Sequence, residues 1–148
     1  MKSPRWFAFG CVALLALLLG GCARAARDTT GFAVVTTGTV DAPFDATWQA
    51  AKAVLRERKL DIYTRDKRGV FVAYTPMKRR RLLLPKRVQY RFFLEPVSDD
   101  VTRVAIEAVQ QVYGVTLLTY PGWHDRKMTD DTQAETLLEA IQAKVTGA

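Results

Sequence analysis

Two adjacent stretches of alternating apolar and polar residues constrain the fold of this chain more than any other feature. In the first stretch, from Val88 to Glu95, every second residue is predicted to face inward: Val88, Tyr90, Phe92 and Leu94. In the second stretch, from Val101 to Tyr113, one face carries Thr102, Val104, Ile106 and Ala108. A period of two is that of a β-strand with one buried face. The sequence Pro-Val-Ser-Asp-Asp at 96–100 is typical of a turn, so the two stretches predict a pair of antiparallel strands.

Three shorter stretches predict further strands of the same sheet: Phe32–Val40, Leu60–Thr64 and Val70–Thr75. The last two are separated by the polar sequence 65–69, which ends in Gly69, and this spacing predicts a hairpin. By contrast, two glycines and a proline indicate a loop over 114–127, with room for one short strand at Val115–Thr119.

Two segments show the helical period of 3.6 residues. The first has an apolar stripe, and Asp41 is predicted to cap it with Pro43 in its first turn. Its stripe consists of Phe44, Trp48, Ala51 and Leu55. The second helix runs from about Asp130 to Val145, or begins at Thr132 if the capping-box spacing of Thr132 and Glu135 is used. Its stripe consists of Ala134, Leu137, Leu138, Ile141 and Val145.

An antiparallel sheet of this kind needs its apolar face covered, and the two helices are the only candidates to cover it. We therefore predict an α+β fold: a two-layer sandwich of an antiparallel sheet with two helices, in the order β-α-β-β-β-β-α. The length of 148 residues supports one domain. We place that domain at 32–148.

The amino terminus has the features of an export signal. Lys2 and Arg5 form a short positive region, and Trp6–Leu19 is a 14-residue apolar run. That run has the length of a secretory signal and is shorter than the about 20 residues that a transmembrane helix needs. The run ends in Leu19-Gly20-Gly21-Cys22. This sequence resembles the lipobox of bacterial lipoproteins, in which a branched residue and two small residues precede a Cys.

The lipobox resemblance implies how the chain is processed and where it resides. Residues 1–21 are then a signal peptide, Cys22 carries a diacylglyceryl thioether and a further acyl chain, and 22–31 form a lipidated tether. Several acyl chains hold a protein on a membrane durably. Because Ala23 rather than an Asp follows the Cys, we expect an outer-membrane lipoprotein that faces the periplasm. In a cell with one membrane, the anchor lies in the cell membrane.

The folded part of the chain also resembles a known family. Its order of elements, with Pro43-Phe44-Asp45, Trp48 and Leu55 in the first helix, is similar to the helix-grip or TBP-like modules of BamC-type envelope lipoproteins. The likeness covers about Ala33 to Val145, and Trp48 and Gly69 are its firmest points. It implies the fold and a non-enzymatic, accessory role in outer-membrane assembly or maintenance, and it transfers no functional residue.

No set of residues with catalytic spacing is evident. The single His, His124, precedes Asp125, which is a pairing that a general base can use. However, no serine lies in a nucleophile motif such as G-x-S-x-G, and no phosphate-binding loop is present. One His and scattered carboxylates lack the spacing of a metal site. We therefore expect that the chain is not an enzyme and that it holds no metal or cofactor.

The distribution of charge is the most informative polar feature. From Lys52 to Arg91 the chain has 14 basic and 3 acidic residues, whereas from Phe92 to Ala148 it has 4 basic and 9 acidic residues. This asymmetry predicts a molecule that is electrically two-sided. Within the basic part we single out a candidate contact surface for a partner or a membrane: Lys78, Arg79, Arg80, Arg81, Leu83, Lys86, Arg87 and Arg91.

Three interpretations of this basic segment remain open. It is a solvated connection whose leucines pack in the core, a contact with anionic lipid, or a docking patch for an acidic envelope protein with Leu82–Leu84 at its centre. Nucleic acid is a common partner of so basic a segment. An exported protein seldom meets nucleic acid, so we expect none here.

A second candidate site lies in the aromatic segment Tyr113–His124. Its candidate ligand-binding residues are Tyr120, Trp123 and His124. Aromatic residues with Pro and Gly can line a groove for a sugar or a peptide, although such residues also cap the open end of a small core. The main functional hypothesis is a membrane-anchored envelope protein that binds or scaffolds through its basic segment. The alternative is a periplasmic module that binds a small ligand or glycan between the sheet and the helices, near the aromatic segment.

Overall fold

The computed structural model describes residues 29–77, 84–114, 121–130 and 132–147. Their elements, in chain order, are β1 (Val34–Val40), α2 (Phe44–Glu57), β2 (Asp61–Asp66), β3 (Val70–Tyr74), β4 (Lys86–Ser98), β5 (Val101–Gly114), β6 (Gly122–Arg126) and α3 (Thr132–Thr146). The predicted α+β class, with an antiparallel sheet and two helices, is confirmed. The predicted order is wrong by one strand, because β6 lies between β5 and the last helix.

The sheet is antiparallel throughout and has the order β1-β5-β4-β3-β2, with β6 paired to β5 outside that path. The long strand β5 uses one edge for two partners. Its residues 102–108 pair with β1, and its residues 110–114 pair with β6. The expected loop over 114–127 is therefore corrected at 122–126, where backbone pairing with the end of β5 stabilises a strand despite its short length and its Gly. The predicted short strand Val115–Thr119 lies outside the described residues.

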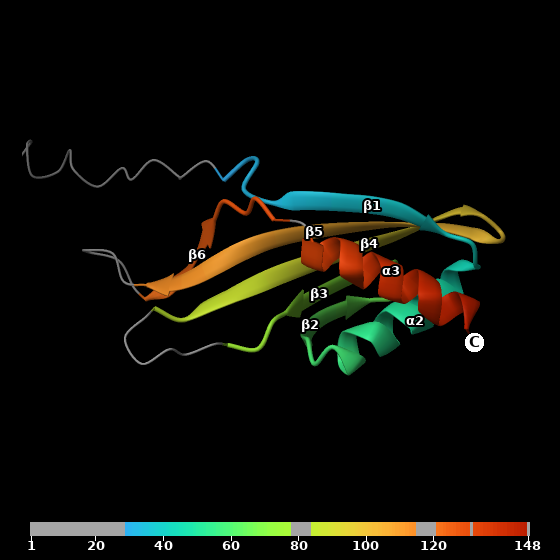
Figure 1. Ribbon diagram of the computed structural model, residues 1–148, viewed down its shortest axis with the longest axis horizontal. Coiled ribbons are helices and arrows are strands. Elements are labelled where there is room, and N and C mark those ends of the chain that lie inside the picture. Colours follow the sequence, from blue (N-terminus) through green and yellow to red (C-terminus); the bar gives the residue numbers. More distant parts are fainter. Residues whose placement is uncertain (1–28, 78–83, 115–120, 131, 148) are drawn as a thin grey trace, which may run out of the picture.

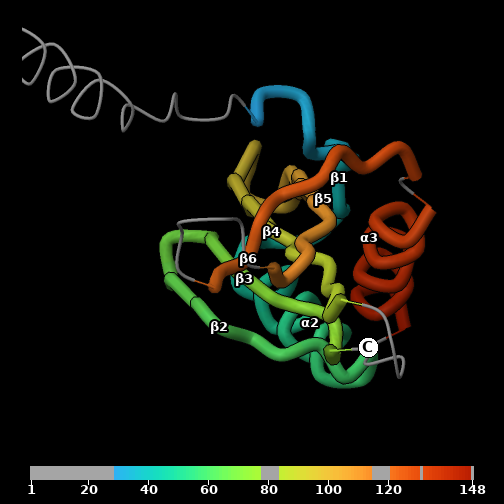
Figure 2. Tube along the Cα trace, turned by 90° about the vertical axis from the view of Figure 1, so that its left-hand side faces the viewer, coloured from blue at the N-terminus to red at the C-terminus, as the bar shows by residue number. Residues whose placement is uncertain are grey.

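Both helices pack on one face of the curved sheet, as Figures 1 and 2 show. The inward faces predicted from alternation are confirmed in the two central strands, where Tyr90, Phe92, Leu94, Thr102, Val104, Ile106 and Ala108 are all buried. The helix stripes meet this face, and Trp48 of α2 stacks on Phe71 of β3 with ring centroids 3.9 Å apart. Burial of these apolar side chains is the main source of stability for the sandwich.

The hairpin between β2 and β3 depends on one glycine. Gly69 has a φ of +111°, in the left-handed region, and a Cβ atom there would lie 2.2 Å from the carbonyl oxygen of Leu94. The Gly69 carbonyl in turn accepts a hydrogen bond from the Leu94 N–H at 2.8 Å. This close backbone approach ties the hairpin to β4, and only glycine can occupy the position without strain.

The helix starts and one turn differ from the predictions in detail. Asp41 does not cap α2, since Pro43 occupies the N-cap position and makes no side-chain cap bond. The helix α3 begins at Thr132, and hydrogen bonds from the Thr132 side chain and backbone hold the pKa of Asp130 below its usual value. β4 continues through Pro96 to Ser98 with a bulge, so the turn before β5 is shorter than the predicted 96–100.

One end of the β4–β5 hairpin extends past the helices and carries β6 (Figure 1). The described chain also begins at this end. Its start is fixed there because the Met128 N–H donates a hydrogen bond of 2.9 Å to the Phe32 carbonyl. The opposite end of the hairpin holds the turn at Asp99 and Asp100. The fold thus has two distinct ends along its long axis.

Candidate functional site

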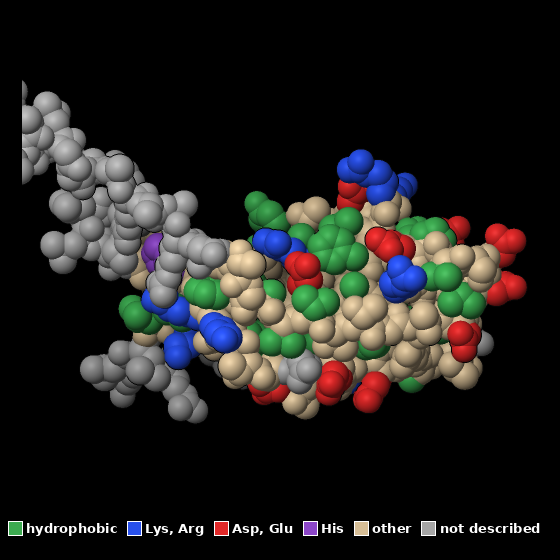
Figure 3. Space-filling model, turned by 90° about the horizontal axis from the view of Figure 1, so that it is seen from above, with side chains coloured by type: hydrophobic (Ala, Val, Ile, Leu, Met, Phe, Trp, Pro, Cys, Tyr) green, Lys and Arg blue, Asp and Glu red, His purple; other side chains and the backbone are tan. Residues whose placement is uncertain are grey.

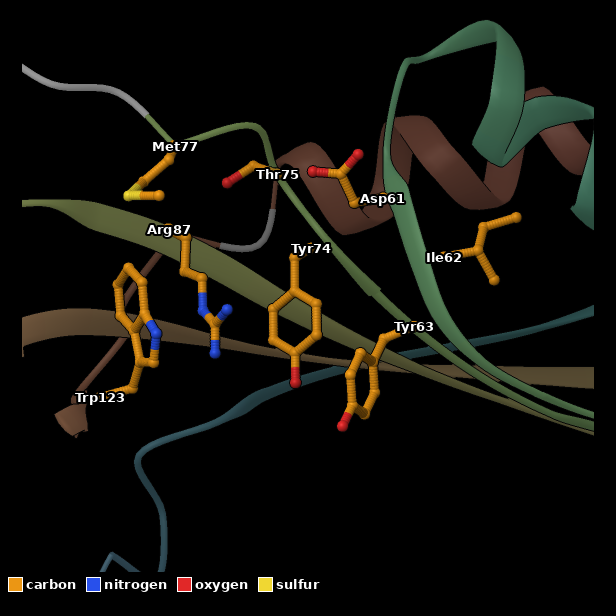
Figure 4. Close-up of a pocket in the computed structure, with 8 residues that line it drawn as sticks. All are labelled: Asp61, Ile62, Tyr63, Tyr74, Thr75, Met77, Arg87 and Trp123. Atoms are coloured by element: carbon orange, nitrogen blue, oxygen red, sulfur yellow. The ribbon is translucent and has the colours of Figure 1, made fainter.

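Five side chains form a row across the face of the sheet that points away from the helices. Tyr63 of β2 lies edge-on to Tyr74 of β3 with centroids 5.9 Å apart, and Tyr113 of β5 lies edge-on to Trp123 of β6 at 5.3 Å. Arg87 of β4 lies between the two pairs. We call Tyr63, Tyr74, Arg87, Trp123 and Tyr113 the aromatic row, and Figure 4 shows four of them side by side.

The Arg87 guanidinium is held between two aromatic rings. Its central carbon lies 3.9 Å from the ring centroid of Tyr74 and 3.9 Å from that of Trp123. The electron-rich faces of aromatic rings attract a cation at this distance. The Arg87 Nε also donates a hydrogen bond of 2.8 Å to Gln111 Oε1. The position of the guanidinium is therefore set by contacts from three strands, β3, β5 and β6.

A chain of hydrogen-bonded side chains connects the row to the sheet. Gln111 Nε2 donates to Gln89 Oε1 at 3.1 Å and to Asp125 Oδ1 at 2.9 Å, and Gln89 Nε2 donates to the Tyr74 hydroxyl at 3.3 Å. Gln89 and Gln111 are buried. A buried polar network restrains its members because breaking any one bond leaves an unpaired polar group.

The row borders a groove of about 550 Å³. Arg87 and Trp123 form one end of the groove, Tyr74 lies in the middle, and Tyr63 lies at the other end (Figure 4). Asp61, Ile62, Thr75 and Met77 complete the lining. Apolar and aromatic walls with a few placed polar groups are typical of ligand sites.

The structure joins two sites that the sequence analysis kept apart. Arg87 was assigned to the basic contact surface and Trp123 to the ligand segment, and the two side chains are in contact. Lys86 is exposed on the helix side of the sheet, since neighbouring residues of a strand face opposite ways. Arg91 is on the outer face with Arg87, where its Nη1 lies 3.9 Å from Glu107 Oε2. The remaining predicted contacts, Lys78, Arg79, Arg80, Arg81 and Leu83, lie outside the described residues, as do Cys22 and Tyr120.

The expectation that Trp123 and His124 share a pocket between the sheet and the helices is corrected. They are consecutive residues of β6, so they face opposite sides of the sheet. Trp123 lines the outer groove, whereas His124 pairs with Val112 on the helix side. The His124 Nε2 is buried, and no described residue bonds to it. The sequence analysis assigned 114–127 to a loop and so did not predict that Trp123 and His124 face opposite sides. Neighbouring side chains alternate between the two faces of a sheet only when they belong to a strand.

Sequence reasoning missed most of the residues that support the row. Tyr63, Tyr74 and Gln111 were placed on strands but were not assigned to a site. Alternation with apolar neighbours was the available signal for Tyr63 and Gln111, whereas the wholly apolar run Val70–Tyr74 gave no sign that Tyr74 faces outward. The strand order needed to bring them together depends on pairing between distant segments.

The two ends of the long axis carry different exposed charges. Lys86, Arg126 and Lys127 are exposed at the end that carries β6, and we call these three residues the basic end. Asp99 and Asp100 are exposed at the opposite end. Figure 3 shows basic side chains at the end where the histidine lies and acidic side chains at the other end, with further side chains of both signs between them. The two ends of the described part of the molecule therefore differ in charge.

The described ranges contain neither a cluster of metal-ligating side chains nor a membrane-spanning helix. No three His, Cys, Asp or Glu side chains come together there in a way that would hold a metal ion. None of the helices described is long and apolar enough to cross a membrane.

No family model matches the chain, and no curated protein matches it. Among solved structures, the chain is similar to the di-domain ARO/CYC StfQ from the steffimycin biosynthetic pathway, with a TM-score of 0.35 and 14% sequence identity. The match covers 78% of this chain and 44% of that one, so the chain spans less than half of its length. The expectation that the chain is not an enzyme is corrected by this finding and is withdrawn. At this TM-score, the likeness assigns neither an activity nor a substrate to the chain.

Proposed function

We propose that this chain is a lipoprotein of the bacterial cell envelope, anchored through Cys22, whose basic end contacts an anionic membrane surface. In this proposal the fold is a helix-grip or TBP-like module of the kind that the sequence resembles. Its place is the periplasmic face of the outer membrane, where it acts as a binding accessory in assembly or maintenance. One observation carries the proposal: the described chain begins at the same end of the molecule as Lys86, Arg126 and Lys127.

The geometry of the anchor supports this orientation. The bond from Met128 to Phe32 fixes the beginning of the chain beside β6. Six residues lie between Cys22 and Thr29, where the described chain starts, so seven residue-to-residue steps join the two. An extended segment of that length spans at most about 25 Å. A lipid on Cys22 therefore keeps this end near the bilayer, and the acidic turn at Asp99 and Asp100 is at the far end.

The charges at the basic end favour the same orientation. Each Lys or Arg near an anionic membrane contributes about 1 kcal/mol of attraction. The three residues of the basic end together thus contribute about 3 kcal/mol, or roughly a hundredfold in binding. Four further basic residues, Lys78–Arg81, follow directly after Met77 in the sequence and lie outside the described residues. Because the proposed anchor already holds the domain close to the membrane, a weak electrostatic contact is enough to orient the domain.

Photo-crosslinking in intact cells tests the orientation. A benzophenone side chain replaces Lys127 in one variant and Asp99 in a matched control at the opposite end. We expect lipid or lipopolysaccharide adducts from position 127 and none from position 99. A discrete protein adduct at 127 would instead identify a docking patch, and equal lipid adducts at both positions would contradict the proposed orientation. Separately, Cys22→Ser should abolish incorporation of labelled palmitate.

A second role, binding of a small ligand or glycan, is favoured by a different observation. Trp123 of the predicted ligand segment lines a groove of about 550 Å³ together with three other residues of the aromatic row. The aromatic row borders this groove from the outer face of the sheet, and Ile62, which packs against the core, borders it from the other side. The role is compatible with the membrane anchor, because the groove lining and the basic end share no residue.

A further inference from the structure

The groove beside the aromatic row has polar groups of opposite charge at separate positions. Arg87 contributes the cation, and Asp61 contributes a carboxylate on the neighbouring wall formed by β2. The Thr75 side chain, which directly follows β3, lies near Asp61 (Figure 4). The ring of Tyr74 lies between Arg87 and Tyr63, and Asp61 and Thr75 lie to one side of these three side chains. A ligand that fits must present an anion to Arg87, an apolar face to the two rings, and hydrogen-bonding groups to the side where Asp61 and Thr75 lie.

Arg87 is prepared to bind an anion. Two rings hold the faces of its guanidinium plane, and Gln111 accepts the hydrogen bond from its Nε. Its two terminal nitrogens make no hydrogen bond or ion pair with another described residue. Guanidinium groups bind phosphate and carboxylate through two parallel N–H donors. Because the rings already restrict the side chain, little conformational entropy remains to be lost on binding.

Tyr63 offers an open ring for stacking. It is 80% exposed, and its only ring contact among the described residues is the edge-on packing against Tyr74. An aromatic ring left in water beside a groove provides a flat apolar surface. The faces of a sugar ring carry C–H groups that pack on such a surface, whereas its rim carries hydroxyls. Asp61 and Thr75 can accept or exchange hydrogen bonds with those hydroxyls.

We propose that this groove binds a sugar ring that carries one anionic group, with the anion on Arg87, the ring against Tyr63 and Tyr74, and hydroxyls on Asp61. The anion is a phosphate or a carboxylate. A phosphorylated glycolipid headgroup and a carboxylated cell-wall sugar share this chemistry. An acidic peptide fits less well, because a second negative charge would approach the Asp61 carboxylate. This inference rests on the second proposed role, ligand binding in the groove, and it stands apart from the proposed membrane orientation, since it needs no lipid and no basic end.

Nuclear magnetic resonance of the protein as cells produce it tests the proposal. The protein is purified from whole cells in a polyoxyethylene detergent, which has no sugar headgroup and no charge and keeps the protein in solution with or without an acyl anchor. The signals followed are the Trp123 indole N–H and the Arg87 Nε–H. The probes are glucose 1-phosphate and glucuronic acid, with glucose and inorganic phosphate as their separate parts. We expect saturable shifts with at least one anionic sugar and at least tenfold weaker binding of glucose and of phosphate. Comparing the two anionic probes distinguishes the two sources.

Matched variants locate the ligand. Tyr63→Ala removes an exposed ring without disturbing the core, and it should weaken binding of the anionic sugar at least fivefold. Arg87→Gln should weaken it more than tenfold. The controls are Val35→Ala, an exposed apolar side chain on the outer face of β1, and Arg91→Gln, which lies on the same strand and face as Arg87. Both controls should bind as the unaltered chain does.

Three outcomes would overturn the proposal. Equal binding of phosphate and glucose 1-phosphate would reduce the site to a simple anion site. Shifts with an Asp-Glu peptide but with neither anionic sugar would make the groove a protein contact. No shift with any probe at millimolar concentration would exclude the site. The titration contains no anionic lipid, so none of these outcomes bears on the proposed membrane orientation. That orientation is tested separately by the crosslinking experiment.

Discussion

Arg87 and Trp123 belong to strands β4 and β6, and the guanidinium carbon of Arg87 lies 3.9 Å from the centroid of the Trp123 ring. β5 separates the two strands, and its Gln111 bonds to Arg87 on one side and to Asp125 of β6 on the other. The contact therefore ties three strands together at the end of the sheet that the helices do not cover. It also unites the basic and aromatic segments in one surface.

The stack of Arg87 on Trp123 is expected to stabilise the fold. A double-mutant cycle with Arg87→Gln and Trp123→Ala should give a coupling energy of about 1 kcal/mol, because a partly desolvated cation over a Trp ring contributes that much. Urea unfolding followed by circular dichroism measures each variant. Lys86→Gln is the matched control, since Lys86 precedes Arg87 but faces the other way. Its coupling to Trp123→Ala should be near zero, and equal coupling for both basic residues would refute the stack.

The stability of the fold should depend on Gly69 in the turn between β2 and β3. Gly69→Ala would place a Cβ atom 2.2 Å from the Leu94 carbonyl oxygen, at a φ of +111° that L residues seldom adopt. Relieving this clash must separate the β2–β3 hairpin from β4, so we expect a loss of about 3 kcal/mol or more in the free energy of unfolding. Gly114→Ala is the control, because nothing lies within 4 Å of its Cβ position. A Gly69→Ala variant as stable as Gly114→Ala would contradict the turn geometry.

Ionisation of Tyr90 should lower the free energy of unfolding at alkaline pH. Burial, and secondly the charge of Asp130, raise the pKa of the Tyr90 hydroxyl from 10.0 to about 12. Between these values the unfolded chain has lost the proton while the folded chain retains it. The folded state then binds more protons, so the free energy of unfolding falls as pH rises. We expect the contribution of Tyr90 to be fully present below pH 10 and to be lost by about pH 12.

Tyr90→Phe tests this dependence. The variant loses the 2.6 Å hydrogen bond from the Tyr90 hydroxyl to Gln133 and is therefore somewhat less stable at neutral pH. Its decline in stability between pH 10 and 12 should be shallower than that of the unaltered chain. Chemical unfolding at a series of pH values provides the measurement. Tyr63→Phe, at an exposed position, should leave the decline unchanged. Parallel pH curves for the unaltered chain and Tyr90→Phe would show that Tyr90 does not titrate in this range.

Much of the fold could be predicted from neighbouring residues alone. The alternation from Val88 to Glu95 identified the buried side chains of β4, and the stripe from Phe44 to Leu55 identified the buried face of α2. Trp48 was correctly assigned to the core. These predictions succeed because the periods of strands and helices can be recognised within a short segment. The apolar face of the sheet and the apolar stripe of the helix are then buried against each other.

The strand β6 could not be predicted in the same way. Its five residues follow a Pro and include a Gly, and they have no apolar alternation that would mark a strand. It exists because the end of β5 offers unpaired backbone groups next to it, and antiparallel pairing satisfies them. The loop assignment followed from the local residues, and the pairing that overrode it involves a segment earlier in the chain.

By itself, the sequence determined the fold class, the inward faces, the need for Gly69 in a tight turn and the asymmetry of charge. It also indicated which residue types were available for binding. Only the tertiary structure decided that Arg87 lies against Trp123, that Trp123 and His124 face opposite sides, and that Phe32 lies at the end that carries β6. The reason is physical: periodicity is set by adjacent residues, whereas a site is set by the register of strands that are distant in the chain, and register depends on the packing of the whole sheet.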